Sequence, residues 1–114
     1  MTWDEVAALA VAQLTADERK SGVLYVDQRE LAAGSTLAID GRDVAVRRPS
    51  AMAFVDREPQ VNWNHSCRYM LIDLASGEVE SFEAQSPPYL RSVPATLRMI
   101  LKGETVPDWT VARP

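Results

Sequence analysis

The stretch CRYMLIDLASGEVESFEA, residues 67–84, contains two β-prone runs on either side of Ser76-Gly77. Glycine accepts the positive φ that a tight turn requires, so the two runs are predicted to pair as an antiparallel hairpin. A loop of two or four residues places Cys67 and Tyr69 on the same face as Phe82, whereas a loop of three residues would reverse that assignment.

The segments before this hairpin carry the same kind of signal. Asp40-Gly41 is typical of a type I′ turn, in which both central residues need a positive φ. Pairing about this turn makes residues 36–48 a second hairpin, with one apolar face and one polar face. Further strands are predicted over 23–26 and 51–56, with a capped turn or short helix over 27–34.

Both ends of the chain are predicted to be helical. Apolar residues recur at helical spacing over residues 3–20, where capping-box sequences begin at Thr2 and Thr15 and predict one helix or two. Near the other end, Pro94 suits the first position of a helix and a short apolar face follows it. The sequence therefore predicts a single α+β domain over residues 1–114. It consists of an N-terminal helix packed on an antiparallel sheet of about five or six strands, and a short C-terminal helix.

The composition excludes several classes of function. The net charge of −4 argues against non-specific binding of nucleic acid, which needs a basic face. No run approaches the roughly 18 apolar residues of a membrane span, and no signal peptide is recognisable near the N-terminus. A single cysteine cannot form an internal disulfide, so a reducing, cytoplasmic location is expected. No motif calls for a cofactor, and no pattern decides the oligomeric state.

Chemistry that needs an imidazole or a thiolate has one possible place. His65 and Cys67 are the sole histidine and cysteine, and in an extended segment residues i and i+2 point to the same side. A catalytic pair is conceivable, with Cys67 as the nucleophile and His65 as its base. The alternative is a core cysteine beside Tyr69, with His65 at the mouth of the strand, since free cysteine is among the most buried residue types. No metal site is expected, because this pair supplies two ligands and a structural zinc needs four.

The polar loop over residues 57–66 is the candidate binding site. It contains Asn62, Trp63 and Asn64, and a further tryptophan, Trp109, occurs late in the chain, where it is expected to pack. Loops of this length are often functional, and tryptophan is enriched at interface hot spots. The alternative is that Trp63 folds back onto the edge of the sheet.

Three functional hypotheses follow. No catalytic motif is present, so the leading hypothesis is a small cytosolic protein-binding domain, such as an inhibitor, immunity or adaptor-like partner of another protein. The first alternative is a cysteine-dependent enzyme that uses Cys67 with His65, which is the less favoured outcome. The second alternative is a small-ligand-binding α+β domain with a pocket between the N-terminal helix and the sheet.

One segment also has a family likeness. Leu71-Ile-Asp-Leu-Ala-Ser-Gly-Glu-Val79 resembles the D-x-x-T/S-G-E-V hairpin of PepSY-type small α+β domains. The resemblance covers this hairpin alone and implies an α+β fold. The insertion between the first strand and the hairpin departs from the compact pattern of that family, so no function is carried over from it.

Overall fold

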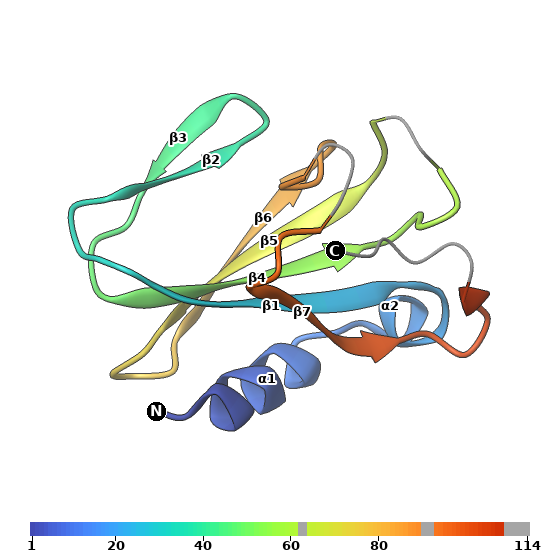
Figure 1. Cartoon of the computed structure of the whole chain (residues 1–114), viewed down its shortest axis with the longest axis horizontal. Coiled ribbons are helices and arrows are strands. Elements are labelled where there is room, and N and C mark those ends of the chain that lie inside the picture. The colour runs from blue at the N-terminus through green and yellow to red at the C-terminus, as the bar shows by residue number, and fades with distance from the viewer. Residues whose placement is uncertain (62–63, 90–92, 109–114) are drawn as a thin grey trace.

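The computed structural model describes residues 1–61, 64–89 and 93–108 (Figure 1). Within these residues two short helices precede seven strands, and every strand pair is antiparallel. The helices are α1 (Trp3–Ala12) and α2 (Ala16–Ser21). The strands are β1 (Val23–Leu31), β2 (Thr36–Ile39), β3 (Arg42–Ala45), β4 (Ser50–Asp56), β5 (Cys67–Asp73), β6 (Val79–Ala84) and β7 (Leu97–Lys102). The predicted α+β class is confirmed.

The N-terminal helical region forms in two pieces because each piece has its own capping box. Thr2 Oγ1 accepts from the amide of Glu5 at 3.1 Å, and Glu5 Oε1 accepts from the amide of Thr2 at 2.9 Å. Thr15 and Glu18 repeat this arrangement with the same distances. The second box therefore starts a new helix just after the first one ends. Among the described residues, no helix is long and apolar enough to cross a membrane.

The main sheet has the strand order β6-β5-β4-β1-β7. The β5–β6 hairpin pairs Tyr69 with Phe82, and the amide of Asp73 donates to the carbonyl of Glu78 at 2.9 Å. That last pair leaves residues 74–77 as a four-residue loop, so the face assignment predicted from the sequence is confirmed.

The β2–β3 hairpin forms a separate two-stranded sheet, which arches over one face of the main sheet (Figure 1). Asp40 and Gly41 have φ values of 52° and 76°, as the predicted type I′ turn requires. Ile39 is buried on the underside of the hairpin, while its upper side is exposed. The predicted segregation of apolar and polar faces is therefore confirmed.

The prediction of a C-terminal helix is wrong, because residues 97–102 form β7, the edge strand beside β1. The pairing shifts register between Met99 and Leu101, so that Ile100 is an extra residue in a β-bulge. Ile100 and Leu101 both pack on the helix side of the sheet, whereas Leu97 is buried on the other side. The bulge thus produces in a strand the apolar spacing that is typical of a short helix.

The prediction of a capped turn or short helix over residues 27–34 is also wrong for most of its length. β1 continues to Leu31, and Asp27 pairs with Met52 on one side and with Leu97 on the other. This part of the strand is polar and lacks an apolar alternation, so only the two neighbouring strands decide its conformation.

The central strands of the main sheet are buried on both faces. On one face, Val6 and Ala10 of α1 pack against the sheet. On the other, the β2–β3 hairpin and Tyr89 cover an aromatic group in which the ring centroids of Phe54 and Tyr69 are 5.2 Å apart. Burial on both sides explains why β4 and β5 are apolar along nearly their whole length.

Candidate functional site

The loop over residues 57–66 leaves the end of β4, returns to the start of β5, and is held tightly at its base. The amide of Arg57 donates to the carbonyl of Ser66 at 3.3 Å. The amide of Ser66 donates to Glu58 Oε1 at 2.9 Å, and the amide of Glu58 donates to Asp56 Oδ1 at 3.0 Å. These bonds join the two ends of the loop to each other and fix the geometry of its base.

His65 and Asp56 form a buried pair beneath the loop. His65 Nε2 lies 2.9 Å from Asp56 Oδ1, and the two side chains are only 6% and 9% exposed. Burial raises the pKa of Asp56, although the neighbouring His65 opposes that rise. The amide of His65 also donates to the carbonyl of Gln85 at 2.8 Å. His65 therefore ties the loop both to β4 and to the segment that follows β6.

Cys67 lies in the core, which was the alternative to a catalytic role. Its side chain is fully buried, and its pKa is raised to about 12, first by burial and then by the negative charges of Asp40 and Asp56. A nucleophilic cysteine needs the opposite, a lowered pKa and access to substrate. The environment of Cys67 therefore does not favour the hypothesis of a cysteine-dependent enzyme.

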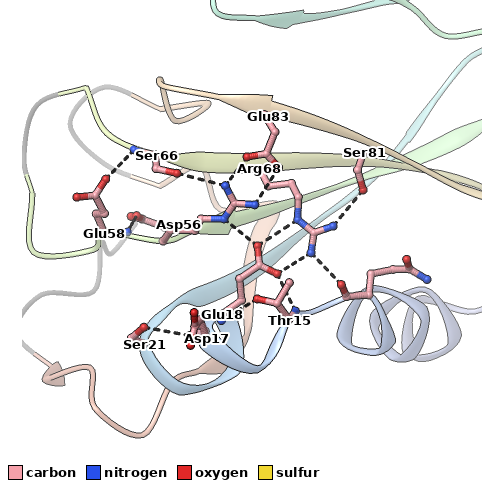
Figure 2. Close-up of polar contacts among 12 residues, drawn as sticks. Thr15, Asp17, Glu18, Ser21, Asp56, Glu58, Ser66, Arg68, Ser81 and Glu83 are labelled. Atoms are coloured by element: carbon pink, nitrogen blue, oxygen red, sulfur yellow. Dashed lines mark hydrogen bonds and ion pairs between the residues drawn. The ribbon is translucent and has the colours of Figure 1, made fainter.

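A second polar cluster lies on the helix side of the sheet and centres on Glu18 of α2 (Figure 2). Glu18 Oε2 accepts from Arg57 Nε at 2.9 Å and from Arg68 Nε at 3.1 Å, and Glu18 Oε1 accepts from Arg68 Nη2 at 2.7 Å. The side chain of Glu18 is only 2% exposed. Burial alone would raise its pKa, but hydrogen bonds from Arg68, from the amide of Thr15 and from Arg57 outweigh that effect and lower it.

The two arginines extend this cluster to the loop and to β6. Arg57 donates to Ser66 Oγ at 3.2 Å and to both carboxylate oxygens of Glu83. Arg68 donates to Ser81 Oγ at 3.1 Å and to the carbonyl of Gln13 at 2.9 Å. The cluster therefore fastens the helical region and the base of the loop to the same edge of the sheet.

Sequence reasoning found the capping role of Glu18 but not its contact with the arginines. The one available signal is Arg68, a charged residue inside the apolar run of β5. A strand that is buried on both faces cannot hold an unpaired guanidinium, so an acidic partner from another element was required. The sequence does not show which acidic residue this is.

A hollow of about 580 Å³ opens beside the loop, between the tip of the β2–β3 hairpin and the segment after β6. The side chain of Asp40 fixes its walls, since its two oxygens accept from the amides of Gln85 and Ser86, each at 2.9 Å. Tyr69 Oη donates to the carbonyl of Ser86 at 2.7 Å. The hollow is lined by Ala38, Asp40 and Gly41, by Asn64 and Tyr69, and by residues 85–89.

The hollow contains one of the residues predicted to bind a partner. Asn64 lines it, and Ser86 Oγ lies 3.4 Å from Asn64 Oδ1. The other predicted binding residues, Asn62, Trp63 and Trp109, lie outside the described residues. Sequence reasoning did not connect Asp40 with this region, because the contact joins segments that are far apart in the chain.

The structure also bears on a ligand pocket beside α1 and on a metal site. The space between α1 and the sheet, where a ligand pocket was one hypothesis, is filled by the buried side chains of Val6, Ala10 and Leu14. Within the part of the chain that the structure describes, no group of three or more His, Cys, Asp or Glu side chains is arranged to hold a metal ion. The loop and the adjoining hollow are therefore the best-supported candidate site.

Comparison with protein families, curated proteins and solved structures finds no match for this chain. The likeness of residues 71–79 to PepSY-type hairpins is thus not accompanied by a family match. A function has to be inferred from the chemistry and geometry of the site.

Proposed function

We propose that this protein is a small protein-binding domain, of the inhibitor, immunity or adaptor kind, which presents the 57–66 loop and the adjoining hollow to another protein. The observation that supports the proposal is the hydrogen bonding of the described part of this region. The loop is bonded across its base, and Asp40 joins the hairpin tip to the segment after β6. Segments that such bonds already hold lose little conformational entropy when a partner binds them.

Two further properties support this proposal over catalysis. The only thiol is buried and has a raised pKa, so it is poorly suited to act as a nucleophile. The net charge of −4 would speed association with a basic partner. A buried thiol without a disulfide also suits a reducing compartment, and we propose a cytoplasmic location on that ground.

The proposal is tested by placing a photo-crosslinking amino acid at Ala38, on the rim of the hollow, in cells of the source organism. The matched control carries the same group at Glu104, an exposed residue after β7. We expect a discrete crosslinked protein from position 38 and none from position 104. Equal crosslinking from both positions would count against the proposed surface.

The partner identified in this way is then purified and its affinity measured by calorimetry. We expect Asn64→Arg, which places a large side chain beside the hollow, to weaken binding at least tenfold, whereas Glu104→Arg leaves it unchanged. Trp63→Ala and Trp109→Ala test the two tryptophans in the same assay. Unchanged affinity in all three site variants would refute the assignment of this surface.

A further inference from the structure

Asp40 gives the hollow a negative charge that none of its described lining residues balances. The lining residues that the structure describes include no lysine or arginine, and no ion pair in that part of the chain includes Asp40. Tyr69 and Tyr89 also line the hollow as neutral phenols, and burial raises the pKa of both further above neutral pH. A ligand group that enters the hollow therefore meets one fixed carboxylate.

The hydrogen bonds that Asp40 already makes orient its carboxylate and leave acceptor sites on it for a further donor. Asp40 Oδ1 accepts one hydrogen bond from the amide of Ser86, and Oδ2 accepts one from the amide of Gln85. A carboxylate has about four acceptor sites, so each oxygen keeps roughly one for a further donor. A guanidinium carries five N–H donors and forms charge-assisted hydrogen bonds with a carboxylate that has acceptor sites left.

The walls of the hollow suit the rest of an arginine side chain. Pro87 and Pro88 offer apolar surface to its methylene groups. The ring of Tyr89 is held in place by edge-on contacts with Phe54 at 6.0 Å and with Tyr25 at 6.3 Å. An aromatic ring near a bound guanidinium adds a cation–π attraction.

We propose that the hollow is a pocket for an arginine side chain of the protein partner, whose guanidinium pairs with the carboxylate of Asp40. This inference rests on the proposed function and specifies its chemistry. It makes arginine the preferred residue, because the ammonium of lysine is a single point charge and lacks the planar fork.

The test uses the full-length ¹⁵N-labelled chain and three blocked tripeptides, Gly-Arg-Gly, Gly-Lys-Gly and Gly-citrulline-Gly. Citrulline keeps the shape of arginine but is uncharged. We expect saturable shifts of the amide signals of Asp40, Gly41 and Ser86 with the arginine peptide, with a dissociation constant on the order of millimolar, as is usual for so small a ligand. The lysine peptide should bind several-fold more weakly, and the citrulline peptide at least tenfold more weakly.

Two variants of equal charge provide the matched comparison. Asp40→Asn keeps a residue that tolerates the positive φ of the turn and removes one acceptor oxygen together with the charge. Asp43→Asn removes one charge from the same exposed hairpin but outside the hollow. We expect at least tenfold weaker binding of the arginine peptide for Asp40→Asn and unchanged binding for Asp43→Asn.

Several results would overturn the inference. These are the absence of saturable shifts up to about 50 mM peptide, equal binding of the three peptides, or an equal effect of the two variants. If Asp40→Asn loosens the hairpin, the comparison of the three peptides on the unmodified chain still tests the inference. The crosslinking at Ala38 is independent of these measurements, so the arginine pocket can fail while the protein-binding surface stands.

Discussion

Replacement of Glu18 by glutamine is expected to destabilise the protein by about 3–5 kcal/mol, the cost of breaking a buried ion pair. Each carboxylate oxygen accepts two hydrogen bonds. Oε1 accepts from the amide of Thr15 and from Arg68, and Oε2 accepts from Arg57 and Arg68. The amide group of glutamine has only one acceptor oxygen, so either orientation loses two hydrogen bonds together with the negative charge.

The assay is thermal unfolding followed by circular dichroism, with urea unfolding as a second measurement. For a chain of 114 residues, 1 kcal/mol corresponds to about 4 °C in Tm, so a decrease of roughly 12–20 °C is expected. The matched control is Glu83→Gln. Glu83 also binds Arg57, but its side chain is 69% exposed, so its loss should cost less than about 1 kcal/mol. A decrease below about 4 °C for Glu18→Gln, or equal decreases in the two variants, would refute the reasoning.

The carboxylate of Glu18 should also make the free energy of unfolding depend on pH. The pKa of Glu18 in the folded protein is lowered from its ordinary value of 4.5. A lowered native pKa adds stability that is complete above about pH 4.5 and disappears as the pH falls through the native pKa. Glu18→Gln lacks this contribution. The difference in unfolding free energy between wild type and variant should therefore narrow between pH 7 and pH 3 in urea titrations.

Three further predictions concern the loop, the thiol and the core. His65→Ala removes the imidazole partner of the buried Asp56 carboxylate, which keeps only its bond from the amide of Glu58 among those described, and should cost about 2 kcal/mol in urea unfolding. The double variant with Asp56→Asn should recover part of that loss, and simple additivity would contradict the pairing. Cys67, with a pKa raised to about 12 and no exposure, should react with iodoacetamide at pH 8 far more slowly in the native chain than in urea. Comparable rates would show that the thiol is accessible. Met70→Ala, at a fully buried position, should cost about 2–5 kcal/mol, whereas Met99→Ala, at a side chain 49% exposed on β7, should cost less than about 0.5 kcal/mol. A large loss for Met99→Ala would mean that β7 buries this side chain.

Local sequence rules were sufficient to predict a helix start or a turn where the contacts that form it are close in sequence. The capping boxes at Thr2 and Thr15 bond to residues three positions away, so the residue types themselves specify where a helix begins. The turn at Asp40-Gly41 likewise depends on two adjacent residues that tolerate positive φ. From these turns the period of two along a strand then predicts which residues share a face.

The same local rules failed to predict the conformation of segments that depend on contacts with elements distant in the sequence. The apolar residues of β7 have the spacing of a short helix, and only the unpaired edge of β1 and the bulge at Ile100 make them a strand. The polar half of β1 has no apolar alternation; β4 pairs with it at Asp27 and Leu31, and β7 pairs with it at Asp27. Pairing energy between strands is non-local, so no property of either segment alone reveals it.

At the candidate site, too, some features follow from the sequence and others only from the tertiary structure. The sequence determined that imidazole and thiol chemistry could involve only His65 and Cys67, and that residues 57–66 form a polar loop. The tertiary structure alone decided that His65 pairs with Asp56, that Cys67 is buried, and that Asp40 reaches the segment after β6. The physical reason is that burial and hydrogen bonding set the chemical properties of a side chain. Both depend on atoms that the fold brings together from remote parts of the chain.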